Sequence, residues 1–274
     1  MSALLQPWLS PDPHKAAVEL AWLRTTPVWA GITGALMVTG VVSSFGDVAL
    51  MAYGLTMLGI AWWGPLRADD GRPFAERTGV KMATSVTLLA LGLNYTQTPF
   101  FFDVLHMHYG FNATWTIAYN PVFLYLVSVA YFTTYFSLCT LTWRALRRRL
   151  PGAPGRLAAG LLAPLAMALL ETLLNANPFT TQLFCYDDMP LMLTFGTLSY
   201  GVAFAWVLPV WAWLDEDAGH RVTLGQVAAG TLAAMYADLL TLDLLRYHVA
   251  PWLTEVEPGA MNLRDFGSSC LISP

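Results

Sequence analysis

The stretch LAAGLLAPLAMALLETLLN at 157–175 contains a single ionisable residue, Glu171, in an otherwise apolar run. This length and composition predict a helix that crosses a membrane, because about 20 apolar residues span the hydrocarbon core. A carboxyl group inside such a helix is costly to bury, so it indicates a functional group by default. The run therefore predicts an α-helical membrane protein and makes Glu171 the first candidate for a functional residue.

The whole chain has the composition of a membrane protein. Of its 274 residues 56% are hydrophobic and 12% are charged, whereas soluble domains carry about 25% charged residues. We therefore expect an all-α, polytopic membrane protein with a single bundle of about seven transmembrane helices. The expected helices are the apolar runs at 26–44, 46–65, 80–102, 119–143, 157–176, 190–214 and 224–246.

The positions of the basic residues predict the orientation of these helices. With the N-terminus inside, twelve of the 14 Lys and Arg residues fall on inner segments, and Arg246 and Arg264 alone fall outside. Cytoplasmic loops carry this excess of positive charge, so we expect the N-terminus inside and the C-terminus outside. The chain then forms one integral-membrane domain, 1–274, with an interfacial N-terminal segment (1–25), the helical bundle (26–246) and an outer C-terminal tail (247–274).

Four polar residues are expected at similar depths in different helices. Asn94, Glu171 and Asp238 each lie 14 residues from the inner end of a predicted helix, which is roughly 21 Å along its axis. Tyr200 lies about 15 Å from the outer end of its helix. This agreement predicts a polar pocket in the outer half of the bundle, opening toward the outer face.

A buried carboxyl group without a charged partner favours its neutral form, so Glu171 or Asp238 would be a proton donor near neutral pH. The alternative is structural: the carboxyl groups hydrogen-bond to Asn94, Tyr95 or Tyr200 and hold helices together. We favour the catalytic interpretation for Glu171 and the structural one for Asp238.

The remaining charged groups have simpler interpretations. Asp243 and Arg246 are spaced to form an ion pair on a helix surface, and the acidic residues at 215–217 are expected in a solvated turn. His106 and His108 are interpreted as loop residues, so no metal site is expected. The basic run at 144–149 follows a membrane span and is interpreted as an anchor to anionic lipid, not to nucleic acid. Phosphate-binding glycine loops, dinucleotide fingerprints, nucleophile elbows and HExxH motifs do not occur.

A set of collinear motifs resembles one family, the cycloeucalenol cycloisomerases or cyclopropylsterol isomerases of sterol synthesis. The resemblance extends from near the N-terminus to about Pro251. The motifs are WLSPDPHK at 8–15, TPVW at 26–29, the segment 77–81, NYTQTPFFFDVL at 94–105, TW at 114–115, NP at 120–121, Tyr135, LET at 170–172, Asn177, Tyr200, Pro209, LDED at 214–217 and LDLLR at 242–246.

The resemblance implies an isomerase that opens the 9β,19-cyclopropane ring of a cycloeucalenol-like sterol and yields an obtusifoliol-like Δ8 sterol. The reaction adds a proton at C19 and removes one from C8, which suits general acid catalysis and an aromatic cavity. In this hypothesis Glu171 donates the first proton, and Asp238 or a water held by Tyr200 accepts the second. The residues expected to orient the acid or line the cavity are Asn94, Tyr95, Asn177, Tyr135, Trp115 and Trp206.

This hypothesis requires no cofactor and no metal. The expected partners are a sterol that arrives from the bilayer and membrane lipid, with no nucleic acid and no obligate protein partner. The expected location is the cytoplasmic membrane of a bacterium or the endoplasmic reticulum of a eukaryote. Two alternatives remain: a proton-coupled transporter of a small or lipidic substrate, because intramembrane carboxyl groups also mark ion pathways, and a non-catalytic sterol-binding protein.

Overall fold

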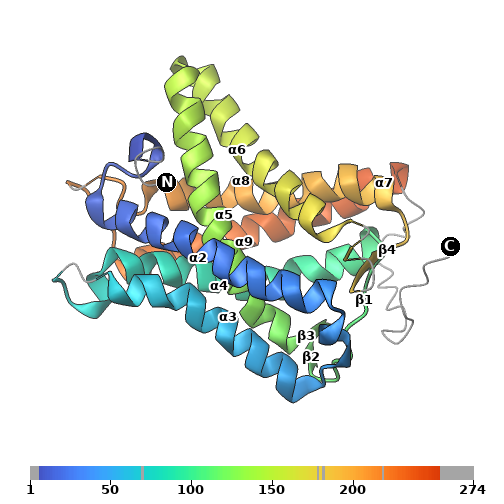
Figure 1. Ribbon diagram of the computed structural model, residues 1–274. Helices are drawn as coiled ribbons and strands as arrows, with labels where there is room; N and C mark the ends of the chain where they lie inside the picture. The colour runs from blue at the N-terminus through green and yellow to red at the C-terminus, as the bar shows by residue number, and fades with distance from the viewer. Residues whose placement is uncertain (1–5, 69–70, 178, 181–182, 218, 254–274) are drawn as a thin grey trace.

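The computed structural model describes residues 6–68, 71–177, 179–180, 183–217 and 219–253. Within these ranges, long helices follow one another as the apolar runs predict, which confirms an all-α bundle (Figure 1). They are α2 (Pro13–Val38), α3 (Asp47–Arg67), α4 (Thr78–Val104), α5 (Val122–Arg149), α6 (Gly152–Asn175), α8 (Thr197–Trp213) and α9 (Leu224–Leu244). Helices form because an apolar segment in lipid must satisfy its backbone hydrogen bonds internally.

Shorter elements complete the described chain. Short 3₁₀ turns lie at η1 (Gln6–Trp8), η2 (Val41–Ser44), η3 (Phe74–Glu76) and η6 (Ala250–Trp252). A single helical turn, α7 (Met189–Leu191), and a π-helical turn, η4 (Met192–Gly196), lead into α8, and a second π-helical turn, η5 (Leu245–Val249), extends α9. The strands are β1 (Met107–Tyr109), β2 (Thr116–Ile117), β3 (Asn120–Pro121) and β4 (Phe184–Tyr186).

Five of the described helical segments are long and apolar enough to cross a membrane: α3, α5, α6, the run Met189–Trp213 and the run Leu224–Trp252. Helices α2 and α4 do not meet this criterion because both are more polar. Arg24 and two threonines lie in the middle of α2, and α4 carries Asn94, Gln97 and several threonines. The number of spans and their orientation remain predictions from the sequence.

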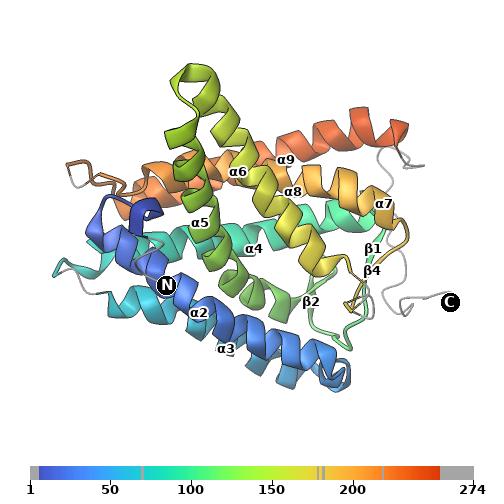
Figure 2. The same cartoon turned by 45° about the horizontal axis from the view of Figure 1, so that its top comes forward.

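Helices α4 and α5 form the centre of the bundle. Helices α2 and α3 lie side by side on one side of α5, and α8 and α9 lie side by side against α4 (Figures 1 and 2). Helix α6 packs on both α5 and α8, and together with α5 it crosses the other helices at a steep angle. The two central helices thus contact both flanking pairs, and most of their side chains are buried.

The loops after α4 and α6 meet at one end of the bundle, which we call the strand end. Strand β1 pairs antiparallel with β4, with His108 opposite Cys185. His108 Nε2 lies 3.2 Å from Asp187 Oδ1, so the two loops also share a polar contact. Nearby, β2 and β3 form a two-stranded hairpin.

The first helix begins at Pro13, before the expected start near Thr26. The Asp12 side chain caps it by accepting hydrogen bonds from the backbone N–H groups of His14 and Lys15, at 3.0 and 2.9 Å. The polar residues at 13–25, which we expected in an interfacial segment, instead form the first turns of α2, where Lys15 and Glu19 are fully buried. This helix continues through the charged residues because partners on other elements compensate for them. The predicted outer tail at 247–274 lies outside the described residues beyond Leu253.

A cluster of buried ions surrounds the start of α2, at the end of the bundle opposite the strands. Arg144 on α5 donates to Glu19 Oε1 at 2.7 Å and to Glu216 Oε1 at 2.6 Å. Lys15 Nζ lies 2.8 Å from Glu216 Oε2 and also donates to the Trp211 and Leu214 carbonyl oxygens. We call the following residues the charged cluster: Asp12, Lys15, Glu19, Lys81, Arg144, Asp215, Glu216 and Arg221.

Asp215 and Glu216 of the predicted solvated turn at 215–217 belong to this cluster, so the expectation was wrong for these two residues, whereas Asp217 is exposed. Asp215 is fully buried, pairs with Lys81 and accepts a hydrogen bond from Thr78 at 2.7 Å. Burial alone would raise the pKa of Asp215, but the hydrogen bonds from Lys81 and Thr78 outweigh burial and hold that pKa below its ordinary value. Burial likewise opposes ionisation of Glu216, while the hydrogen bond from Arg144 and the charge of Lys15 hold the Glu216 pKa low.

The predicted pair between Asp243 and Arg246 was also wrong. Arg246, just beyond α9, forms an ion pair with Asp103 near the end of α4. Asp103 is buried, so a guanidinium group placed next to it lowers the cost of burying its charge. This pair fixes α9 to α4 near the strand end.

Candidate functional site

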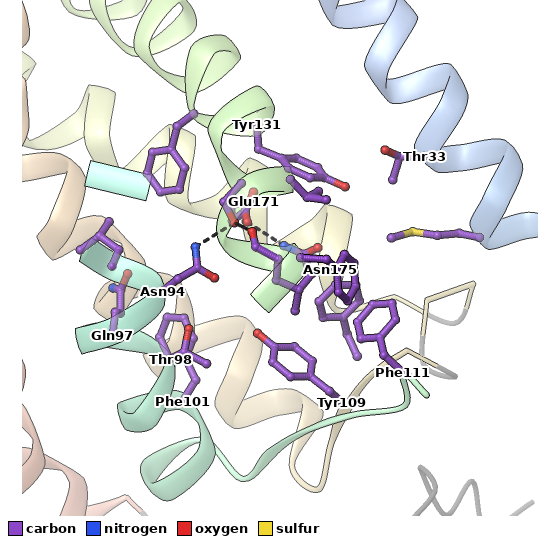
Figure 3. Close-up of a pocket in the computed structure, with 18 of the residues that line it drawn as sticks. Thr33, Asn94, Gln97, Thr98, Phe101, Tyr109, Phe111, Tyr131, Glu171 and Asn175 are labelled. Carbon is purple, nitrogen blue, oxygen red and sulfur yellow. Dashed lines mark hydrogen bonds between the residues drawn. The ribbon is translucent and has the colours of Figure 1, made fainter. Parts of the chain in front are cut away.

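A cavity lies in the half of the bundle nearest the strands. It is bounded by the second half of α2, by α4, the first half of α5 and the end of α6, and strands β1 and β4 contribute Tyr109 and Phe184. The space between these elements amounts to about 830 Å³ when its opening to solvent is included. Most of its wall is aliphatic or aromatic (Figure 3).

Glu171 places a carboxyl group in this cavity from the last turns of α6. Alanine and leucine favour helix along this segment, so Glu171 and Asn175 lie one turn apart on the same face. Asn175 Nδ2 donates to Glu171 Oε1 at 2.8 Å (Figure 3). Glu171 Oε2 is shielded from solvent and has no hydrogen-bond partner among the described residues. The described lining includes no Lys, Arg or His, so no cation compensates this carboxyl group.

Asn94 faces the same cavity from α4 and is held in a defined orientation. Its Nδ2 donates to the Ala90 carbonyl oxygen at 2.8 Å and to Ser128 Oγ on α5 at 2.9 Å. Its Oδ1 accepts from Asn120 Nδ2 at 2.7 Å. Asn120 is fully buried on β3 and also donates to the Asn94 backbone carbonyl oxygen. The amide of Asn94 is therefore fixed by hydrogen bonds on both sides.

Aromatic side chains form much of the remaining wall. Tyr200 from α8 packs against Phe101 from α4, with ring centroids 4.4 Å apart. Tyr109 packs edge-on against Phe184 at 5.5 Å, and its other edge-on neighbour is Phe102 at 5.3 Å. Aromatic rings and the hydroxyl groups of the tyrosines thus line the cavity, a combination that suits a large apolar molecule with few polar groups.

The structure brings three of the predicted site residues to the cavity: Asn94, Glu171 and Tyr200. The helices that carry them lie around one space. Their chemical roles remain predictions. Sequence reasoning missed Asn175 and Ser128, although Asn175 was detectable because it lies four residues after Glu171. Asn120 belongs to the NP motif at 120–121 but received no role.

The structure does not bring the other candidates to this cavity. Tyr95, Trp115 and Trp206 are 58%, 51% and 47% exposed and face outward. Tyr95 follows Asn94 directly, and successive residues of an α-helix point about 100° apart. Asn177 lies beyond the end of α6, where its side chain donates to the Leu173 and Leu174 carbonyl oxygens. Tyr135 is buried behind the wall, against Phe132 at 5.6 Å.

Asp238 is buried in a different place. It lies on α9, which packs against α4 and α8, and it does not line the cavity. Both of its carboxyl oxygens are shielded from solvent without a hydrogen-bond partner among the described residues. The sequence predicted Asp238 at the same level as Glu171, but the structure does not bring its side chain to the cavity.

Comparison with known proteins gives one similar curated protein. The chain is 27% identical to cycloeucalenol cycloisomerase of Arabidopsis thaliana over 256 residues, which cover 89% of this chain and 90% of the plant protein. The chain is therefore similar to a cycloeucalenol cycloisomerase over most of its length. No family model matches the chain. No solved structure matches it significantly.

Six of the motifs that resemble the cycloeucalenol cycloisomerase family lie in two regions of the structure. WLSPDPHK at 8–15, the segment 77–81 and LDED at 214–217 contribute to the charged cluster. The segments 94–105, 120–121 and 170–172 contribute to the cavity or support it. The family resemblance therefore includes both a buried ionic framework and the walls of the cavity.

Proposed function

We propose that this membrane isomerase opens the cyclopropane ring of a 9β,19-cyclopropyl sterol and yields the Δ8 sterol. The observation that carries the proposal is the Glu171 carboxyl group, which faces an aromatic cavity without a cationic partner. Its plant relative is named for the isomerisation of cycloeucalenol. Substrate and product are isomers, so the reaction needs neither oxidant nor reductant.

In the proposed reaction, protonated Glu171 transfers its proton to C19 of the sterol. The C9–C19 bond breaks, C19 becomes a methyl group, and C9 is left with positive charge. Loss of the proton from C8 then forms the C8=C9 double bond, so atoms and charge balance. General acid catalysis of this kind typically contributes about 10²–10⁴-fold to the rate.

Other cavity residues would support both steps. Asn175 donates to Glu171 Oε1, which leaves Oε2 to carry the proton toward the substrate. The rings of Phe101, Tyr109 and Tyr200 offer π faces that stabilise a developing cation. The second proton passes to the Glu171 carboxylate itself or to a water held by Tyr200, because Asp238 does not line the cavity.

The test is isotopic. Purified protein in lipid or detergent is incubated with cycloeucalenol in deuterated water, and the product is analysed by mass spectrometry and NMR. We expect a Δ8 sterol with one deuterium in the C19 methyl group. Recovery of unchanged cyclopropyl sterol across several substrates would contradict the proposal and favour a sterol-binding protein without catalysis.

A further inference from the structure

Three hydroxyl groups from three helices meet at the α2–α3 wall of the cavity. Thr33 Oγ1 on α2 lies 2.7 Å from the Tyr53 hydroxyl on α3. The Tyr131 hydroxyl on α5 lies near both of them. All three residues line the cavity, and Figure 3 shows the Tyr131 and Thr33 oxygens facing each other.

The surroundings of this hydroxyl cluster are apolar. The neighbouring wall consists of Leu36, Met37 and Val42 from α2 and the turn after it. Tyr131 packs against Trp29, with ring centroids 4.4 Å apart. The described lining places neither a cation nor a second carboxyl group here. A ligand group that binds at this wall must therefore be neutral and must form hydrogen bonds.

Hydroxyl chemistry specifies the ligand group further. Each hydroxyl has one proton and two acceptor lone pairs. The hydrogen bond between Thr33 and Tyr53 uses one hydroxyl proton and leaves acceptor lone pairs, so an alcohol O–H can donate to the cluster. If one hydroxyl rotates, its proton can instead be donated to the alcohol oxygen. The cluster can thus both accept from and donate to a single alcohol group.

A comparison within the same helices separates binding from packing. Thr26 on α2 and Thr134 on α5 also share a hydrogen bond, at 2.6 Å, and they hold the same two helices together. Neither of them lines the cavity. Thr26 and Thr134 therefore already hold α2 and α5 together two turns away from Thr33, whereas the hydroxyl groups of Thr33, Tyr53 and Tyr131 face the cavity.

We propose that Thr33, Tyr53 and Tyr131 bind the hydroxyl group of the sterol. The α2–α3 wall and α6 lie on different sides of α5, so the alcohol would be held at one wall while Glu171 approaches the ring system from another. The three hydroxyls select an alcohol end group and set the position of the cyclopropane relative to the acid. This inference rests on the proposed function for its substrate.

The experiment compares a cyclopropyl sterol with its analogue that has hydrogen in place of the hydroxyl. The variants are Tyr53→Phe and Tyr131→Phe, with Thr26→Val as the matched control outside the cavity. With the alcohol, each Phe variant should raise KM about tenfold, the cost of one lost hydrogen bond. With the deoxy analogue, wild type and the Phe variants should have the same KM. Thr26→Val should leave the ratio between the two substrates unchanged.

Two results would overturn the inference. Equal KM values for the alcohol and the deoxy analogue in the wild-type protein, with turnover intact, would contradict the hydroxyl site without contradicting the isomerase function. If the wild-type protein turns over neither sterol, the equilibrium dissociation constants of the alcohol and the deoxy analogue are measured instead. Tighter binding of the alcohol in wild type, lost in the Phe variants, would support the hydroxyl site even without the reaction. Equal or absent binding of the two sterols refutes it.

Discussion

Buried carboxyl groups have cationic partners in the charged cluster, whereas the described lining of the cavity offers none. In the charged cluster Glu19 and Glu216 share Arg144, and Glu216 also contacts Lys15. In the cavity Glu171 receives one amide hydrogen bond and faces no cation among the described lining residues. Compensated charges stabilise helix contacts, whereas an uncompensated carboxyl group can hold a transferable proton. The comparison separates the residues that maintain the fold from Glu171, the residue to which we assign the chemistry in our proposal.

The largest effect should come from the uncompensated carboxyl group. Glu171→Gln should lower kcat/KM by about 10²–10⁴-fold, because the amide keeps the shape and loses the acidic proton. The thermal unfolding midpoint should stay near that of wild type, since Glu171 has no ionic partner to lose. Sterol turnover and differential scanning fluorimetry in the same detergent measure both quantities.

Asp238→Asn is the matched control, because Asp238 is also a buried carboxyl group without a described partner but lies outside the cavity. We expect its kcat/KM to remain within a few-fold of wild type. Loss of activity in Asp238→Asn with retention in Glu171→Gln would reverse the assignment of the acid.

The opposite pattern should follow from breaking the charged cluster. Arg144→Met leaves Glu19 and Glu216 buried without their guanidinium partner, and such losses typically cost about 3–5 kcal/mol. We expect a marked fall in the unfolding midpoint, with kcat of the remaining folded protein close to wild type. If kcat fell as far as in Glu171→Gln without loss of stability, the division between framework and cavity would fail.

A smaller effect concerns pH. The folded-state pKa values of Asp215 and Glu216 lie below their ordinary values. Groups shifted in this direction stabilise the fold fully above the unfolded carboxyl pKa of about 4 and lose that contribution as pH falls through the folded values. The unfolding midpoint should therefore fall as pH decreases below about 4. Glu216→Gln should flatten this decline, and an unchanged pH profile in that variant would contradict the role of Glu216.

The sequence predicts the order of the helices well but their rotation poorly. Apolar runs identify each long helix because lipid requires continuous apolar length, and counting along them correctly places Asn94, Glu171 and Tyr200 near one another. Tyr95 is misassigned because the side of a helix that faces a cavity depends on how its neighbours pack. The depth of a residue along its helix does not determine this packing.

The charged cluster was missed for a different reason. Lys15 and Glu216 are far apart in sequence, and nothing local indicates that they pair. The available signal was the occurrence of charged residues of both signs within or next to apolar segments, such as Glu19 and Arg144. A charge that must be buried requires a partner, but sequence alone does not say which partner it has.

The pairing of β1 with β4 has a consequence for how the protein folds. The two strands enclose a loop of chain that contains α5 and α6 in full. Contacts that close such long loops are entropically costly and form slowly compared with local helix contacts. Tyr109 on β1 and Phe184 on β4 belong to this late contact. The helices can therefore pair before Tyr109 and Phe184 complete the wall, and we expect the cavity to reach its final shape late in folding.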